Sequence, residues 1–544
     1  MLPESPQKRF LLGLFIFALV IGIGARVAHL DRKLFWQDEA VAALHVSGHS
    51  WAEYFPLFDG RVHSLAQVRS FVELDRSTTL GTVFKVLSVD DPHLGPLFYI
   101  LDRWTLEAIG GGAPGTFRLP SVIVGILSIG FAFALGVQLF RSRTGGAVLA
   151  GLVALSPFHI LYARQTREYA LFGTLVFAAN LCLLRALDGR KPRDWAIYAV
   201  TVALGMYTDP LFALVVGAHA AIALAGARRN LRGLLTFFAA AAAGLLAYVP
   251  WALNAFRGTQ SVAAGIGWGF VAFPVKLSAE KWAFNTGAVF FDAEFADMRL
   301  VFIAVLALAI AALSIVVVAR ASESRVRTFA FTMTIVPVVP FILFDAIHGA
   351  HYATIPRYLT AGWIGLELCV AGAIVSAIKF GGRAAFGAYA AFAFLVAAGA
   401  LSAIIDNGAE NWWDNDDQVA YQAVARRINT TPQPLIVSYD FHELPLLISN
   451  YVRPGSSFLL YLRPHVPDLP PGTRQAYLLV PVPAELATFQ ARDGRRYRIT
   501  NVSPLVANAI TEFHDRLAKD KQYGSYGTIR VERPDNALWS LVPR

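Results

Sequence analysis

Two short motifs in the first hundred residues carry groups that can accept a proton. Residues 35–40 contain the adjacent acids Asp38 and Glu39, directly after a long apolar run. Two neighbouring carboxylates repel each other, and one of them can act as a general base toward an alcohol or an amine. The same two acids also fit a solvated loop or the start of a helix, where the helix dipole favours negative charge.

The second motif spans residues 90–99 and contains His93 between two prolines. Pro92 ends any helix before it, and Pro96 can begin one after it. His93 is therefore expected at a helix start near a membrane surface. The alternative is an ordinary turn with a surface histidine.

A third motif combines positive charge, a carboxylate and aromatic rings. It occupies residues 162–169, between two apolar runs. Charged groups in such a place are costly unless they contact one another or a polar ligand. The motif is therefore either a self-satisfied ion-pair cluster or part of a ligand site. Its members are Tyr162, Arg164, Arg167, Glu168 and Tyr169.

Further arginines stand at the ends of other apolar runs. Arg118 opens one run, where its guanidinium could either extend to the membrane surface or hold a phosphate. Arg357 and Tyr358 directly precede a later run.

Acidic residues elsewhere leave a metal site open. Asp209 lies in a turn at residues 207–210, and with Asp38 and Glu168 it could hold a divalent ion, although carboxylates choose poorly among Mg, Mn and Ca. Residues 414–417 could bind such an ion or cap the following helix. The sequence contains no phosphate loop, dinucleotide fingerprint or zinc-protease motif, so it predicts no certain cofactor.

Composition places these motifs in a membrane protein. Of 544 residues, 56% are hydrophobic and 16% charged, against roughly 25% charged in ordinary soluble domains. This balance excludes a disordered chain, a fibrous protein and a typical cytosolic enzyme. The two cysteines provide no disulfide framework or zinc spacing. The net charge of +9 is typical of basic cytoplasmic loops, and no pattern indicates a nucleic-acid partner.

Eleven apolar runs predict an all-α bundle of about eleven transmembrane helices. The first run follows a basic N-terminus, which is expected in the cytoplasm. Residues 95–109 carry Asp102, Arg103 and Glu107. They are expected to form an interfacial or re-entrant helix, because counting them as a span would turn the basic loops outward. The predicted spans are about residues 10–30, 118–140, 145–163, 169–187, 195–208, 210–227, 233–253, 299–319, 328–346, 357–378 and 384–405.

This topology leaves large outer segments and predicts two domains. Residues 1–405 form the membrane domain, including an outer loop at residues 31–117 with interfacial helices. Residues 406–544 lose the long apolar runs and are expected to form a soluble α/β domain. Its predicted elements are buried strands at residues 434–439 and 476–481 and helices at residues 417–428 and 504–517.

All the unusual polar motifs map to the outer side, which was assigned from loop charge alone. Carboxylates and arginines on the same side of the helix bundle suit a reaction in which a phosphate leaves a membrane-anchored donor. In order and sidedness, the motifs resemble those of the GT-C glycosyltransferases that use polyprenyl-phosphate sugars, such as the protein O-mannosyltransferases and the bacterial aminoarabinose and related lipid A glycosyltransferases. The motifs are Asp38-Glu39, residues 92–97, residues 118–121, residues 164–169 and residues 356–358.

The resemblance implies a role for each matching residue. Asp38 would be the catalytic base with Glu39 beside it, and Glu168 would be a second acid. The remaining matches would bind the donor phosphate and lipid: His93, Arg118, Arg164, Arg167, Tyr169, Arg357 and Tyr358. Two positions depart from the family pattern. Residues 92–97 replace the usual His-Pro-Pro-Leu, and Asp209 stands where a histidine is common.

The expected protein is thus a bacterial inner-membrane glycosyltransferase with a GT-C bundle and a periplasmic active site. It would move one sugar, with inversion, from a polyprenyl-phosphate donor to a glycolipid, glycan or protein. Membrane lipids would be further partners. The alternatives are a transporter or flippase of lipid-linked sugars, a ligase or polymerase that uses lipid-diphosphate glycans, and a non-catalytic assembly partner of the same fold.

Overall fold

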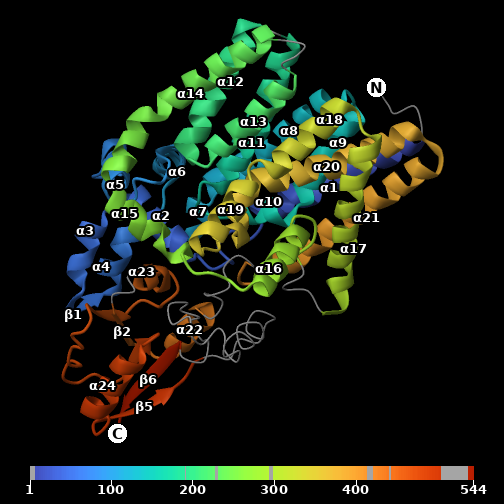
Figure 1. Ribbon diagram of the computed structural model, residues 1–544. Coiled ribbons are helices and arrows are strands. Elements are labelled where there is room, and N and C mark those ends of the chain that lie inside the picture. Colours follow the sequence, from blue (N-terminus) through green and yellow to red (C-terminus); the bar gives the residue numbers. More distant parts are fainter. Residues whose placement is uncertain are drawn as a thin grey trace. The chain divides into compact units, whose positions relative to one another are not determined.

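The computed structural model describes residues 6–189, 191–226, 231–292, 298–412, 421–439, 443–503 and 537–544. The chain divides into two compact units (Figure 1). Unit 1 consists of Met1–Ala28, Leu87–Phe98 and Arg118–Gly408, and unit 2 of His29–Val86, Tyr99–Phe117 and Ala409–Arg544. Most of residues 29–117 therefore cluster with the C-terminal segment.

Within the described residues, eight helical segments are long and apolar enough to cross a membrane, and each coincides with a predicted span. They are α1 (Pro6–Val27), α7–α8 (Pro114–Phe140), α11 (Tyr169–Gly189), α14 (Leu231–Arg257), α17 (Val301–Ala321), α18–α19 (Ser324–His348), α20 with the turn before it (Pro356–Phe380) and α21 (Gly382–Gly408). The all-α bundle and its multi-pass character are confirmed.

The other three predicted spans form shorter helices. The run at residues 145–163 divides into α9 (Arg143–Leu155) and α10 (Pro157–Tyr162), because Pro157 has no N–H to continue the first helix. The remaining two are α12 (Pro192–Thr208) and α13 (Phe212–Ala225). At about 1.5 Å per residue, α13 is shorter than a bilayer core of about 30 Å.

The centre of unit 1 is α20 (Thr360–Phe380), which packs against α9, α11, α17, α18 and α21 (Figure 1). Small residues allow this packing. A Cβ at Gly365 would collide with the backbone at Met333 and Thr334 on α18 (Ser324–Ile335), so the two helices approach at backbone distance. Close contact through small residues is the usual basis of helix association in membranes.

The segments of unit 1 at residues 254–298 and 339–359 form short helices. They are α15 (Thr259–Ile266) and α16 (Val275–Ala288), with α19 (Val339–His348) leading back to α20. The predicted non-spanning run forms α6 (Pro96–Ile109), which follows α5 (Leu80–Asp90), and most of both helices belongs to unit 2.

Unit 2 is built on a six-stranded mixed sheet, which confirms the predicted α/β character. The strand order is β1-β3-β2-β4-β6-β5, in which β2, β3 and β4 are parallel. The strands are β1 (Asp59–Ser64), β2 (Leu435–Tyr439), β3 (Ser457–Tyr461), β4 (Ala476–Leu479), β5 (Tyr497–Asn501) and β6 (Leu538–Pro543). Both predicted strands are present, as β2 and β4. Every residue of these two strands is buried, which is typical of parallel strands covered on both faces.

The helices of unit 2 are short. They are α2 (Gln37–Ser47), α3 (Trp51–Tyr54), α4 (Leu65–Arg69), α7 (Pro114–Phe117), α22 (Tyr421–Ile428), α23 (Glu443–Ser449) and α24 (Pro483–Asp493). Phe489 of α24 packs with Leu435 and Val437 of β2 in the core. The predicted helix at residues 417–428 is seen as α22, whereas residues 414–417 and the predicted helix at 504–517 lie outside the described residues.

The contact between α1 and α9 gives a stability prediction. A Cβ at Gly22 would collide with the carbonyl of Ala154, whereas one at Gly24 would meet nothing within 4 Å. Replacing Gly22 by leucine should therefore lower the free energy of unfolding by about 1–3 kcal/mol through overpacking. Thermal unfolding in detergent measures the effect, with Gly24→Leu as the matched control. Equal melting temperatures for the two variants would contradict this account of the packing.

Candidate active site

Arg167, Glu168 and Tyr169 form a compact cluster at the start of α11. Arg167 Nη2 donates to Glu168 Oε1 at 3.0 Å and to the Tyr169 hydroxyl at 3.4 Å. The guanidinium carbon of Arg167 lies 5.4 Å from the centre of the Tyr169 ring. Arg167 is 7% exposed and Glu168 is 3% exposed. Because removing charges from water is costly, this pair depends on its ionic and aromatic partners.

Arg357 joins this cluster from the far end of the chain. It lies in the turn Pro356–Leu359 before α20, and its guanidinium carbon is 5.9 Å from the centre of the Tyr169 ring. Two further rings surround it, Tyr358 at 5.4 Å and Trp268 at 5.8 Å. Tyr169 therefore contacts both guanidinium groups. The structure brings together two motifs that the sequence singled out separately.

Asp209 adds a second carboxyl group near Glu168. It lies in the turn between α12 and α13, where its Oδ1 accepts a hydrogen bond from the Leu211 N–H at 2.8 Å. Partial burial, together with the nearby Glu168 carboxylate, raises the pKa of Asp209 to about 7, although the Leu211 N–H and Arg167 act against this. Asp209 therefore titrates near neutral pH, beside the arginine cluster.

Arg118 and Arg164 are buried in the same unit and are 0% and 1% exposed. Arg164 donates to the Asn407 side chain and, at 2.8 Å, to the carbonyl oxygen of Ala28. These contacts hold the ends of α1 and α21 to the loop before α11, which is a structural task. Burial, together with the nearby Arg118, lowers the pKa of Arg164 to about 10, so this guanidinium stays protonated at neutral pH. A role for either arginine toward a phosphate stays a prediction.

His93 packs against α15. A Cβ at Gly265 would collide with its imidazole ring. The turn around His93 is held from α14, where the Trp251 indole donates to the carbonyl oxygen of Leu94 at 3.0 Å and Asn254 donates to that of Ser88 at 3.0 Å. The histidine thus packs near the end of α15, at Gly265, which lies three residues before Trp268.

The acidic pair Asp38-Glu39 lies in unit 2, in the first turn of α2. The two side chains differ in their surroundings. Glu39 is fully buried, and its Oε2 accepts a hydrogen bond from the Trp36 N–H at 3.4 Å, whereas Asp38 is only partly buried. Of the two acids, Asp38 is therefore the more exposed, while Glu39 helps to begin the helix.

The C-terminal segment anchors the chain that leads into α2. The Tyr451 hydroxyl accepts a hydrogen bond from the Phe35 N–H at 2.6 Å, and Lys33 donates to the carbonyl oxygen of Asn411 at 2.7 Å. The Lys33 ammonium also lies 4.1 Å from the centre of the Trp412 ring. The C-terminal segment therefore helps to fix the backbone that leads to Asp38.

Asp102 is a buried acid that the sequence analysis noted only as a charge. It is fully buried on α6, and neither carboxyl oxygen has a hydrogen-bond partner among the described residues. Burial, together with the nearby Glu39 carboxylate, raises the pKa of Asp102 well above its usual range. A signal was present in the sequence: Tyr99, Asp102 and Leu106 have the spacing of one helix face, and all three are fully buried.

The next residue, Arg103, anchors α6 to the end of α2. It donates to the carbonyl oxygens of Val46 and Ser47 at 3.1 and 3.2 Å and pairs with Glu107 at 2.7 Å. A cation at this end of a helix is favoured by the helix dipole.

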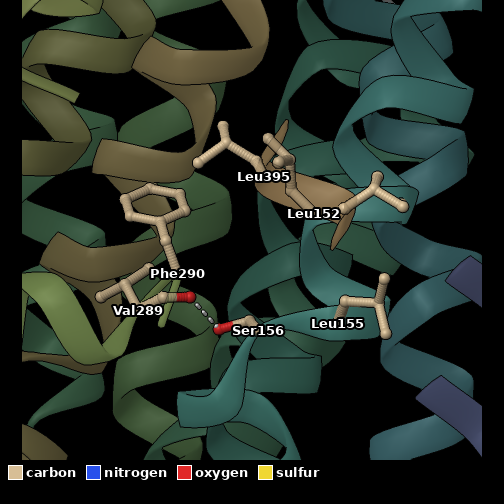
Figure 2. Close-up of a pocket in the computed structure, with 8 residues that line it drawn as sticks. Leu152, Leu155, Ser156, Val289, Phe290 and Leu395 are labelled. Carbon is tan, nitrogen blue, oxygen red and sulfur yellow. Dashed lines mark hydrogen bonds between the residues drawn. The ribbon is translucent and has the colours of Figure 1, made fainter. Parts of the chain in front are cut away.

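The described residues contain no group of three or more His, Cys, Asp or Glu side chains placed to hold a metal ion. Glu168 and Asp209 supply two carboxyl groups, which is fewer than the three ligands of such a group. A small hollow between α9 and α21, shown in Figure 2, is lined mainly by apolar side chains such as Leu152, Phe290 and Leu395. Its one hydroxyl, on Ser156, donates to the carbonyl oxygen of Val289 at 2.7 Å. The hollow offers no reactive group.

Comparison with known proteins places these residues in context. A family model described as dolichyl-phosphate-mannose-protein mannosyltransferase matches residues 96–253. The crystal structure of ArnT from Cupriavidus metallidurans bound to undecaprenyl phosphate is similar over 90% of this chain and 95% of that chain, with 14% identity and a TM-score of 0.51. No curated protein sequence matches the chain.

Two further structures are similar at lower scores. The apo form of the same ArnT covers 93% of this chain and 97% of its own, with 14% identity and a TM-score of 0.49. The oligosaccharyltransferase of Archaeoglobus fulgidus in its apo form is similar over 91% of this chain and 70% of that chain, with 12% identity and a TM-score of 0.47.

The resemblance to the GT-C glycosyltransferases is therefore confirmed at the level of the fold. The chain is a multi-pass membrane protein with a GT-C fold. The family match includes Arg118, residues 164–169 and Asp209, whereas Asp38 and Arg357 lie outside it.

The buried Asp102 gives a pH-dependent stability prediction. The folded protein keeps a proton that an unfolded aspartate releases above about pH 4. The unfolded state therefore binds fewer protons, and the free energy of unfolding falls as pH rises, by about 1.4 kcal/mol per pH unit while the proton is retained. Replacing Asp102 by asparagine should remove this part of the slope and stabilise the protein more at pH 7 than at pH 4.

Melting temperatures between pH 4 and pH 8 measure the slope. The exposed Glu73 offers a control, because Glu73→Gln should keep the wild-type slope. An Asp102→Asn variant with an unchanged slope would show that Asp102 is ionised in the folded protein.

Proposed function

We propose that this protein is a glycosyltransferase of the bacterial inner membrane with its active site on the periplasmic side. It moves one monosaccharide from a polyprenyl-phosphate donor to a glycolipid, a polysaccharide or a protein. The observation that carries the proposal is the cluster of Arg167, Tyr169 and Arg357, in which one ring contacts two guanidinium groups.

The position of this cluster indicates the kind of ligand. Guanidinium groups suit phosphate because they can donate two parallel hydrogen bonds to it. Arg167 lies two residues before α11 and Arg357 lies in the turn before α20, and both helices are apolar enough to span a membrane. A ligand that is polar at one end and apolar at the other fits such a place, and a lipid phosphate has this form.

In the proposed reaction, Asp38 takes the proton of the acceptor hydroxyl or amine as the acceptor attacks the anomeric carbon. The bond from that carbon to the phosphate oxygen breaks, and the electron pair stays on the phosphate. The donor phosphate changes from a singly charged diester to a monoester with a second negative charge, which Arg167 and Arg357 stabilise. A well-placed charge stabiliser lowers a barrier by about 3–4 kcal/mol.

The other site residues have supporting roles in this proposal. In-line attack inverts the configuration at the anomeric carbon, and Glu168 orients the acceptor. Tyr169 and Tyr358 position the arginines, while Arg118 and Arg164 add positive charge behind them. His93 contacts the lipid side of the donor. The proposal requires the Asp38 carboxylate to reach a donor bound at Arg357.

Two observations support the reaction class and its location. The family model that matches residues 96–253 describes mannosyltransferases that use a lipid-linked sugar, and the ArnT structure is described as bound to undecaprenyl phosphate. The short loops opposite the polar motifs are rich in lysine and arginine, which is typical of a cytoplasmic face.

A transporter of lipid-linked sugars is the second candidate, because ionisable groups also lie among the helices of unit 1. His159 Nε2 lies 3.0 Å from Glu367 Oε2, and both side chains are buried. Buried charges within membrane helices are frequent in transport pathways. Movement of the lipid across proteoliposome membranes, without formation of a new glycosidic bond, would favour this candidate.

A variant at the proposed base tests the function. Asp38→Asn should reduce sugar transfer by about 10²–10⁴-fold because it removes the proton acceptor. It should leave binding of undecaprenyl phosphate unchanged, whereas Arg357→Ala should weaken binding and transfer together. The first step is mass analysis of periplasmic glycans and lipids with and without the gene, which identifies the transferred sugar. Transfer is then measured with the purified protein and that donor.

Three outcomes would contradict parts of the proposal. If Asp38→Asn retains most of its transfer activity, another group takes the proton. Products extended by long glycans instead of one sugar would indicate a ligase or polymerase. If the wild-type protein binds no polyprenyl phosphate, the arginine cluster has another ligand and the proposed function fails.

A further inference from the structure

The arginine cluster includes an aromatic residue that none of the recognised motifs contains. Trp268 lies in the turn Gly267–Gly269, between α15 and α16, and the guanidinium carbon of Arg357 is 5.8 Å from the centre of its ring. Its ring is also 6.5 Å from the Tyr358 ring, at an interplanar angle of 28°. Trp268 therefore forms one wall of the space around Arg357.

The turn that carries Trp268 is fixed in place by residues just before Arg357. The His351 N–H donates to the carbonyl oxygen of Gly269 at 3.1 Å, and His351 Nδ1 is 2.8 Å from the carbonyl oxygen of Val271. The Tyr352 hydroxyl donates to the carbonyl oxygen of Ile266. Burial, together with the nearby Tyr358, raises the pKa of Tyr352 to about 12, so this hydroxyl remains a donor at neutral pH.

Two features make this connection specific to the sequence. A Cβ at Gly269 would collide with the Tyr352 ring, so only glycine allows the ring to pack against the turn. The Asp345 carboxylate accepts hydrogen bonds from the N–H groups of Tyr352 and Ala353 at 2.9 and 2.6 Å. Trp268 and Arg357 are thus held by one network, and their spacing is set before any ligand arrives.

Trp268 is the most open of the three rings around Arg357. It is 44% exposed, whereas Tyr169 is 5% exposed and Tyr358 is partly buried. The face of an indole ring carries partial negative charge and is apolar. One face of a sugar ring presents C–H groups with partial positive charge, which pack well on such a surface. A ring next to a phosphate-binding arginine therefore lies where a sugar attached to that phosphate can reach it.

We propose that the Trp268 indole is the platform on which the sugar ring of the lipid-linked donor packs, which makes Trp268 a specificity-determining residue. This inference rests on the proposed function. The ligand class is a polyprenyl-phosphate monosaccharide whose sugar has an unhindered C–H face. Arg357 binds the phosphate, and Trp268 recognises the group attached to it.

The other occupant of this surface to be tested is the apolar part of the lipid. Phe270, on the same segment, is 46% exposed, and its ring lies 5.9 Å from that of Phe344. A general apolar surface would use Phe270 and Trp268 alike. A sugar platform depends on Trp268 and not on Phe270, because Trp268 is the one of these two residues that lies next to Arg357. This difference provides a matched control.

The test compares two kinds of lipid phosphate, one without a sugar and one with a sugar attached to the phosphate. Wild-type protein in lipid nanodiscs is titrated with undecaprenyl phosphate and with a panel of undecaprenyl-phosphate monosaccharides, including mannose, glucose and aminoarabinose. We expect the wild type to bind one or more of the sugar-bearing lipids about three- to tenfold more tightly than the bare lipid, which is the range for one aromatic packing contact. Trp268→Ala should abolish this preference, and Trp268→Phe should keep most of it.

The bare lipid is the reference ligand, because Trp268→Ala should weaken binding of the sugar-bearing lipids by more than it weakens binding of the bare lipid. Phe270→Ala should keep the preference, and Arg357→Ala should weaken binding of both kinds of lipid. The inference is overturned if Trp268→Ala weakens binding of all lipids equally, if Phe270→Ala loses the preference as well, or if the wild type shows no preference for any sugar. In the last case the bare lipid still binds and the proposed function stands. If the wild type binds no lipid phosphate at all, the proposed function itself has failed.

Discussion

The interaction on which the candidate site depends is the contact of two arginines with the Tyr169 ring. Arg167 is almost fully buried and Arg357 is partly buried, both at the ends of apolar helices. Such charges need compensation, and the Tyr169 ring contacts both of them. Glu168 pairs with Arg167, and Asp209 has a pKa raised to about 7, chiefly through burial, so it is only partly ionised at neutral pH. Two guanidinium groups that contact one ring are the arrangement from which we propose an anionic ligand.

The two units carry different residues of the proposed active site. Unit 1 holds the arginines on helices packed around α20, while unit 2 holds Asp38 at the start of α2. Tyr451 of the C-terminal segment accepts a hydrogen bond from the backbone before α2, Asn411 accepts one from the Lys33 side chain, and β1 pairs with β3 of the same sheet. The C-terminal segment thus has a physical task, which is to support the loop that carries the proposed base.

Long-range contacts mark the limit of what the sequence could predict. Runs of about twenty apolar residues have few alternatives to a membrane helix, so the eight long spans could be identified, and Pro157 explains why one further run divides. The clustering of residues 164–169 with Arg357 was expected from their common side of the membrane, and the structure shows this contact. By contrast, the pairing of β1 with β3 depends on residues almost 400 positions away in the chain. The roles of Trp268 and the burial of Glu39 also depend on tertiary partners, and the meeting of Asp38 with Arg357 stays a prediction.

The most direct measurement of the central claim is photo-crosslinking with an undecaprenyl phosphate analogue that carries its reactive group next to the phosphate. The account predicts that the label is recovered on peptides from residues 162–169 and 352–359 of the purified protein in nanodiscs, and that an excess of unlabelled undecaprenyl phosphate prevents it. Labelling confined to the basic loops at the opposite ends of the helices, or labelling that excess unlabelled lipid does not reduce, would contradict the claim that the two arginines bind a lipid phosphate.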